Sequence, residues 1–224
     1  MSRPTTTELA LIARFEQERV AAPRSGYTAR KLTIEGLTGG EMLSDISKQR
    51  ANANKLLFRF LRLTKLDIMI ANIEGGTHDY AIPRSASAEL IINDNDLEEF
   101  EQQVVRFEAL VAGEYSAVES SISLTLSKID HPKRVIEESA AGCLVWAIAA
   151  AHDGVYRYSY SDPSRAERAS NLAIVRSDEA QTVVVVLIQS TTEAGITELA
   201  DTLASAFELG DGEVGCSESS TTLY

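Results

Sequence analysis

The sequence predicts an α+β fold in which antiparallel-rich sheets are covered by helices, arranged as two tandem α/β sandwich halves of the ferredoxin-like type. Short segments that alternate between apolar and polar residues, as half-buried strands do, recur between turn-rich stretches. Amphipathic segments with helical spacing separate them. A chain of 224 residues that is 44% hydrophobic can bury one or two cores. We expect the first half at residues 1–115 and the second at 116–224, although no internal repeat is visible.

The first half is expected to have the element order β-α-β-β-α. A helix is predicted over about residues 44–63, because apolar side chains recur there on one helical face. A second helix should follow a turn at residues 93–96, with Asn95 as its cap and Glu98 three residues later. Three segments have the pattern of strands, namely residues 28–34, 66–74 and 87–93.

The second half is expected to contain two helices and a hairpin. One helix should run from about Pro132 to Ala151, since proline suits the first helical turn, and its apolar composition predicts burial on most of its circumference. The last helix should end at Gly210. The expected strands are residues 121–126, 155–159, 171–176 and 182–188, the last two joined by a turn at 177–180, with a short strand around Val214.

The charge of the chain excludes two classes of partner. A formal net charge of −12 leaves no concentrated Lys/Arg surface for nucleic acid or for an anionic membrane. No apolar run reaches bilayer length, and the N-terminus lacks the apolar core of a signal peptide. Cys143 and Cys216 form neither a disulfide framework nor a Cys-x-x-Cys site, so free thiols are expected. We predict a cytoplasmic protein that binds neither nucleic acid nor membrane.

The residues that commonly hold metals or transfer protons are scattered along the chain. His152-Asp153 lacks the intervening residue of a His-x-Asp ligand pair. The carboxylate pairs fall in the first turns of expected helices, where acidic side chains suit the helix dipole. The residues concerned are His78, His131, Glu98-Glu99 and Glu137-Glu138. No metal site is therefore predicted in this chain.

Two stretches carry a recognisable pattern. The first is Gly39-Gly40-Glu41 leading to Asn52-Ala53-Asn54-Lys55-Leu56-Leu57, and the second is Gly75-Gly76-Thr77 leading to Ala81-Ile82-Pro83-Arg84. Together they resemble the lid, or dimerisation, domain of bacterial aminoacyl-histidine dipeptidases, which are zinc exopeptidases of the carnosinase type. The similarity extends over nearly the whole chain, more loosely in the first thirty residues. The resemblance implies a homodimer, with zinc held only in a flanking peptidase domain, and the chain as either an excised domain or a stand-alone lid.

The positions that would contact substrate differ from the family pattern. Glu41 stands where the resemblance implies the histidine that stabilises the oxyanion, Tyr80 where it implies a substrate-binding asparagine, and Gln189 where it implies an arginine. Loss of one oxyanion donor typically costs ~10²–10³ in rate. A carboxylate about 4 Å from the developing charge would add repulsion on the order of 4 kcal/mol at an effective dielectric of about 20.

The retained residues are interpreted as structural. The glycines of the two pairs suit left-handed turn conformations, and the Asn52 block suits an amphipathic helix with asparagines that bond nearby loops. The structural set is Gly39, Gly40, Asn52, Asn54, Gly75, Gly76 and Pro83. The sequence thus predicts a peptidase lid that is inert by itself. The alternative is a stand-alone binding module whose surface lies around Glu41, His78, Asp79 and Tyr80, and binding of zinc or nickel would separate the two.

Overall fold

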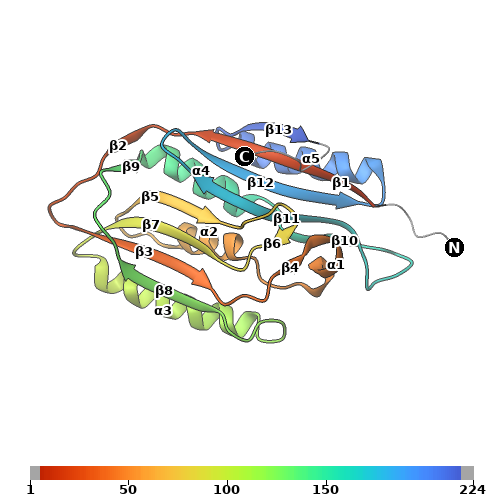
Figure 1. Cartoon of the computed structure of the whole chain (residues 1–224), viewed down its shortest axis with the longest axis horizontal. Coiled ribbons are helices and arrows are strands. Elements are labelled where there is room, and N and C mark those ends of the chain that lie inside the picture. Colours follow the sequence, from red (N-terminus) through yellow and green to blue (C-terminus); the bar gives the residue numbers. More distant parts are fainter. Residues whose placement is uncertain (1–5, 218–224) are drawn as a thin grey trace.

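Nine strands form one antiparallel sheet in the computed structural model, which describes residues 6–217 (Figure 1). From one edge to the other the strands are β13 (Glu213–Ser217), β1 (Thr7–Glu16), β12 (Gln181–Ser190), β11 (Ala166–Ser177), β5 (Ile68–Gly75), β7 (Ala86–Asn93), β3 (Tyr27–Glu35) and β8 (Ser123–Lys128), while β10 (Gly154–Tyr158) pairs with β11. Two short ladders lie outside this sheet, β2 (Arg19–Ala21) with β9 (Arg134–Ile136) and β4 (Gly40–Glu41) with β6 (Ala81–Ile82).

Four helices cover one face of the sheet. They are α2 (Ala53–Leu63), α3 (Leu97–Glu114), α4 (Glu138–Ala150) and α5 (Glu193–Glu208). Alternation along the strands separates the two faces, because Leu11 and Val186 pack in the helix-covered core whereas Ala10 and Leu187 pack in a second cluster. That second cluster also contains Met42 from α1 (Met42–Asp45) and Ile46 from η1 (Ile46–Lys48). We call the sheet surface that these two short helices partly cover the open face.

The α+β class and its antiparallel, helix-covered sheet are confirmed, but the strands do not divide at residue 115. β1 lies between β12 and β13, among strands of the second half, and β8 pairs with β3 of the first half. β11 pairs with β5 through Val175↔Gly75 and Arg176↔Glu74, so the sheet is continuous across the two halves. These two strands therefore pair across the expected boundary, which stays a prediction, because sheet pairing depends on apolar faces rather than on order along the chain. Strand β1 was not predicted.

Two predicted helices begin in the wrong place. The helix over 44–63 is interrupted after η1, where Gln49 has a φ of 53°, and Asn52 then caps α2 by accepting from the backbone N–H groups of Asn54 and Lys55. The helix expected from Pro132 begins at Glu138, since residues 134–136 form β9 against β2. Its cap is Glu137, whose carboxylate accepts from the N–H groups of two residues that follow.

Two finer predictions are also wrong. The cap of α3 is Asp96 rather than Asn95, and it makes no side-chain capping bond. Helix α4 is not buried around most of its circumference, since four of its side chains are buried but Trp146 is 55% exposed. Trp146 instead lies under two cations, with the guanidinium of Arg62 5.5 Å and the ammonium of Lys65 5.6 Å from its ring centre.

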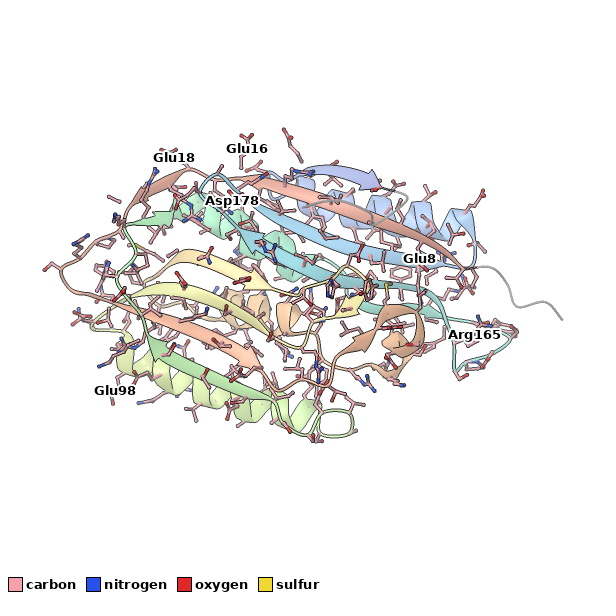
Figure 2. All side chains as sticks on the ribbon, in the orientation of Figure 1. Glu8, Glu16, Glu18, Glu98, Arg165 and Asp178 are labelled. Atoms are coloured by element: carbon pink, nitrogen blue, oxygen red, sulfur yellow. The ribbon has the colours of Figure 1, made fainter. Side chains whose placement is uncertain are left out.

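Acidic side chains are spread around the molecule. Figure 2 shows Glu8 and Glu16 at separate points of β1, and Glu98 at the lower left of the view, on α3.

Within residues 6–217, no helix is both long and apolar enough to cross a membrane. The first five residues, on which the signal-peptide prediction partly rests, lie outside the described range.

Candidate functional site

The first glycine pair shapes the loop that carries Glu41. Gly39 has a φ of 62° and Gly40 a φ of 143°, and a Cβ on Gly40 would lie 2.8 Å from Nη1 of Arg50. Arg50 donates to the carbonyl of Gly39, while the backbone N–H of Glu41 donates to Asp45 at 3.0 Å. Glu41 pairs with Ala81 and is exposed. These contacts hold Glu41 next to the segment that contains Tyr80.

The second glycine pair lies where the two halves of the sheet meet. A Cβ at Gly75 would collide with Oδ1 of Asn54, and one at Gly76, whose φ is 76°, would collide with the carbonyl oxygen of Ala173. The close approach of β5 to β11 therefore requires residues without side chains. Both glycine pairs have a structural reason in the fold.

The two asparagines join α2 to β11. Asn52 Nδ2 donates to Asp153 Oδ1 at 2.8 Å and to the carbonyl oxygen of Leu172 at 3.1 Å. Asn54 Nδ2 donates to the same carbonyl at 3.1 Å. Both side chains are buried, and the nearby Pro83 carbonyl accepts from the N–H of Ala53, which begins α2. Each asparagine replaces water for backbone groups that would otherwise be unpaired inside the protein.

Lys55 and Asp153 complete this buried network. Lys55 Nζ donates to the carbonyl oxygens of Ile148 and Ala149 at 3.0 Å each and of Ala151 at 2.5 Å, which places a cation at the C-terminus of α4. Burial raises the pKa of the Asp153 carboxyl to about 6, against the opposing effects of its bond to the Leu172 N–H and of the Lys55 charge. Burial also lowers the pKa of Lys55. The network is a structural tie between the halves.

The histidines do not gather. His152 Nδ1 lies 2.6 Å from Ser170 Oγ, and burial, followed by the Lys55 charge, lowers the pKa of this imidazole. His131 Nδ1 lies 3.1 Å from the carbonyl oxygen of Pro132. His78 stacks on Tyr80, with ring centres 5.4 Å apart. Over residues 6–217, no group of three or more His, Cys, Asp or Glu side chains could hold a metal ion, so these residues do not fit a zinc centre.

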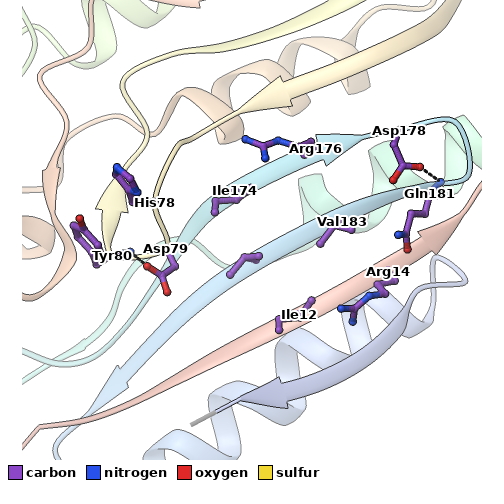
Figure 3. A pocket seen from close by; sticks show the side chains of 11 residues that line it. Ile12, Arg14, His78, Asp79, Tyr80, Ile174, Arg176, Asp178, Gln181 and Val183 are labelled. Carbon is purple, nitrogen blue, oxygen red and sulfur yellow. Dashed lines mark hydrogen bonds between the residues drawn. The ribbon is translucent and has the colours of Figure 1, made fainter. Parts of the chain in front are cut away.

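A cavity of about 390 Å³ lies on the open face between the loop of residues 78–80 and strands β1, β12 and β11 (Figure 3). Apolar side chains form its floor, and His78, Asp79 and Tyr80 form one end. Figure 3 shows Arg14 and Arg176 on either side of Val183 toward the other end. The cavity thus combines a hydrophobic floor with two guanidinium groups.

The three substituted positions are placed differently. Tyr80 is half exposed and lines the cavity, and its carbonyl accepts from the N–H next to Glu41, at Met42, at 2.8 Å. Glu41 does not line the cavity. Gln189 is buried on β12, pairs with Ala169 of β11, and has an Oε1 without a hydrogen-bond partner within the described range. The structure therefore brings Glu41 and Tyr80 together and leaves Gln189 apart from the cavity lining.

Several residues of this region were not found from the sequence. Asp153 was considered only as half of a ligand pair, and the one available signal for Lys55 was its place in the Asn52 block. Arg14 and Arg176 give no signal at all, since they meet only through pairing of both strands with β12.

Three of the matches with known proteins are informative. Residues 32–119 match the family model described as the peptidase dimerisation domain. The chain is 28% identical over 180 residues to the cytosol non-specific dipeptidase of Escherichia coli (strain K12), covering 80% of this chain and 37% of that protein. The crystal structure of aminoacylhistidine dipeptidase from Vibrio alginolyticus matches with a TM-score of 0.92 at 26% identity, covering 95% of this chain and 44% of that chain. The chain therefore spans less than half the length of both relatives.

Proposed function

We propose that this chain acts as the lid and dimerisation module of a dipeptidase-like metallopeptidase. Its resemblance to the lid domain of aminoacyl-histidine dipeptidases is confirmed, and residues 32–119 match the peptidase dimerisation domain. One observation carries the proposal. The retained family positions make contacts that the fold needs. Of the three that differ, Glu41 and Tyr80 have exposed side chains, and Gln189 is buried away from the cavity lining. By itself the module hydrolyses no peptide.

The zinc of such an enzyme would be held by a flanking domain. The described residues do not fit a zinc centre, so no step of hydrolysis is assigned to them. In a parent enzyme, the carboxylate of Glu41 near an oxyanion would oppose the reaction, which favours an impaired or non-peptidase parent. The name of the Escherichia coli relative supports a cytoplasmic location.

The first experiment measures self-association by multi-angle light scattering over two orders of magnitude of concentration. A mass of twice 24.4 kDa is expected. Trp146→Glu and, at the sheet edge, Thr125→Pro then ask whether the exposed side of α4 or strand β8 forms the contact. A monomer at every concentration would refute dimerisation.

The second experiment tests whether the module is inert. Purified chain supplied with zinc should release no histidine from Xaa-His dipeptides. Hydrolysis that survives purification and disappears in His78→Ala or Glu41→Gln would contradict the proposal. The mass of the native polypeptide in its source cells is then informative. A polypeptide about twice as large would carry the flanking domain, and its zinc content and dipeptidase activity would be measured next.

A second candidate is a stand-alone binding module. The cavity supports it, because His78, Asp79 and Tyr80 form one of its ends. Stoichiometric binding of zinc or nickel that is abolished by His78→Ala or Glu41→Gln would favour this module over the plain lid. Absence of such binding would favour the lid.

A further inference from the structure

The floor of the open-face cavity is built from matched rows across three strands. Ile12 of β1, Val185 of β12 and Ile174 of β11 stand in one row, and each is no more than 5% exposed. These three side chains therefore form a continuous apolar floor within the packed sheet.

The neighbouring row is cationic. Arg14 pairs with Val183, and Val183 pairs with Arg176 on its other side. Residues two apart on a strand share a face, so this row lies about 7 Å from the apolar row and on the same side of the sheet. The two arginine backbones are two strand spacings apart, roughly 10 Å, and their long side chains can meet above Val183.

The carboxylates at the cavity have local backbone partners. Asp79 Oδ1 accepts from the N–H of Tyr80 at 2.9 Å. Asp178 Oδ1 accepts from the N–H groups of Ala180 at 2.7 Å and Gln181 at 2.9 Å, which closes the β11–β12 turn. Glu16 and Glu74 also lie near the arginines in the strand registers, but neither lines the cavity. Within residues 6–217, the Arg14 guanidinium makes no hydrogen bond or ion pair.

We propose that this cavity binds a small amphipathic carboxylate, with its carboxylate between Arg14 and Arg176 and its apolar body over the row of Ile12, Val185 and Ile174. Guanidinium groups bind carboxylates through paired, charge-assisted hydrogen bonds. The stacked rings of His78 and Tyr80 close the apolar end, and a planar ring on the ligand would pack against them.

The test uses 3-phenylpropionate as the probe, titrated into the full chain by calorimetry. Its carboxylate and ring are separated by a length that fits the two rows. Saturable binding with a stoichiometry of one per chain is expected, and 3-phenylpropanamide, which has the same shape without the charge, should bind at least tenfold more weakly. Acetate and phosphate, which lack the apolar body, should also bind at least tenfold more weakly.

Two variants from different elements assign the site. Arg14→Gln should weaken binding of 3-phenylpropionate at least tenfold, whereas Arg24→Gln, the same change at an exposed arginine outside the cavity, should not alter it. Tyr80→Ala should weaken binding of 3-phenylpropionate but leave the weak binding of acetate unchanged. Thermal unfolding of each variant shows that the fold is kept.

Three outcomes would overturn the proposal. One is no saturable binding to the unaltered chain. Another is binding of 3-phenylpropanamide or of phosphate as tight as that of 3-phenylpropionate. Equal binding of the amide would show that the charge contributes nothing, and equal binding of phosphate would show that the apolar body contributes nothing. The third is full affinity in both Arg14→Gln and Tyr80→Ala. Because the light-scattering result does not depend on this cavity, failure of either proposal leaves the other open to its own test.

Discussion

The carboxyl group of Asp153 makes the stability of this protein depend on pH in a direction opposite to that of most carboxylates. Its pKa is raised to about 6 from the ordinary 3.8, chiefly because burial disfavours the charged form. A raised pKa means that the folded state holds the proton more tightly than the unfolded state does. The stabilisation is complete below pH 3.8 and is lost as the pH rises through about 6.

The size of the effect follows from the two pKa values. The difference between 3.8 and about 6 gives about 3 kcal/mol in the free energy of unfolding, at about 1.4 kcal/mol for each pH unit. Most of this change should fall between pH 4 and pH 7. Asp153→Asn removes it, because an amide oxygen can still accept from Asn52 and Leu172 but carries no proton that titrates.

The assay is urea unfolding of the unaltered chain and of Asp153→Asn at several pH values. Other titrating groups affect both proteins and cancel in the difference. The unaltered chain should lose about 3 kcal/mol relative to the variant as the pH rises. A flat difference, or one that grows with pH, would refute the reasoning and would mean that Lys55 holds the carboxylate ionised despite its burial.

Two further substitutions test the tie between the halves. Lys55→Met removes three hydrogen bonds from a cation to the end of α4 and should lower the free energy of unfolding by about 2 kcal/mol in urea, whereas Lys128→Met, at an exposed position, should change it by less than about 0.5 kcal/mol. An equal effect of both would show that the bonds of Lys55 add nothing. Gly76→Ala should cost about 2 kcal/mol or more, because the added methyl group meets the carbonyl oxygen of Ala173 at a φ of 76°, while Gly113→Ala inside α3 should stabilise by up to about 1 kcal/mol. Thermal unfolding measures both, and a neutral Gly76→Ala would contradict the close approach.

The local elements were predictable where a continuous apolar run was bounded by a turn. The strands β11 and β12 each have such a run, buried on both faces, and their turn at residues 177–180 was placed correctly. The helix predicted over 44–63 failed because its apolar residues serve two surfaces. Ile46 packs on the open face with Leu187, whereas Leu56 packs in the helix-covered core. Periodicity along a sequence does not say on which side of a sheet a residue will lie.

The candidate site shows the same limit. The loop with Tyr80 could be singled out from the family pattern, because its glycines and proline recur in order. Arg14 and Arg176 could not, since they are 162 positions apart in the sequence and meet only across β12. Asp153 was visible as a residue, but its burial follows from packing that the sequence does not show, and the hydrogen bonds that oppose its raised pKa come from Asn52 and Leu172, in two other elements.

The position of β1 bears on how the chain is made. This strand is near the start of the sequence, yet both of its neighbours, β12 and β13, are near the end. At about 5–20 residues per second, a ribosome needs roughly nine to thirty-five seconds between completing β1 and completing β12, the first of its two neighbours. For that time an apolar strand has no partner on either side, and non-local pairing of this kind closes slowly. The growing chain therefore has a long interval in which chaperones, or the same strand of another nascent chain, compete for β1.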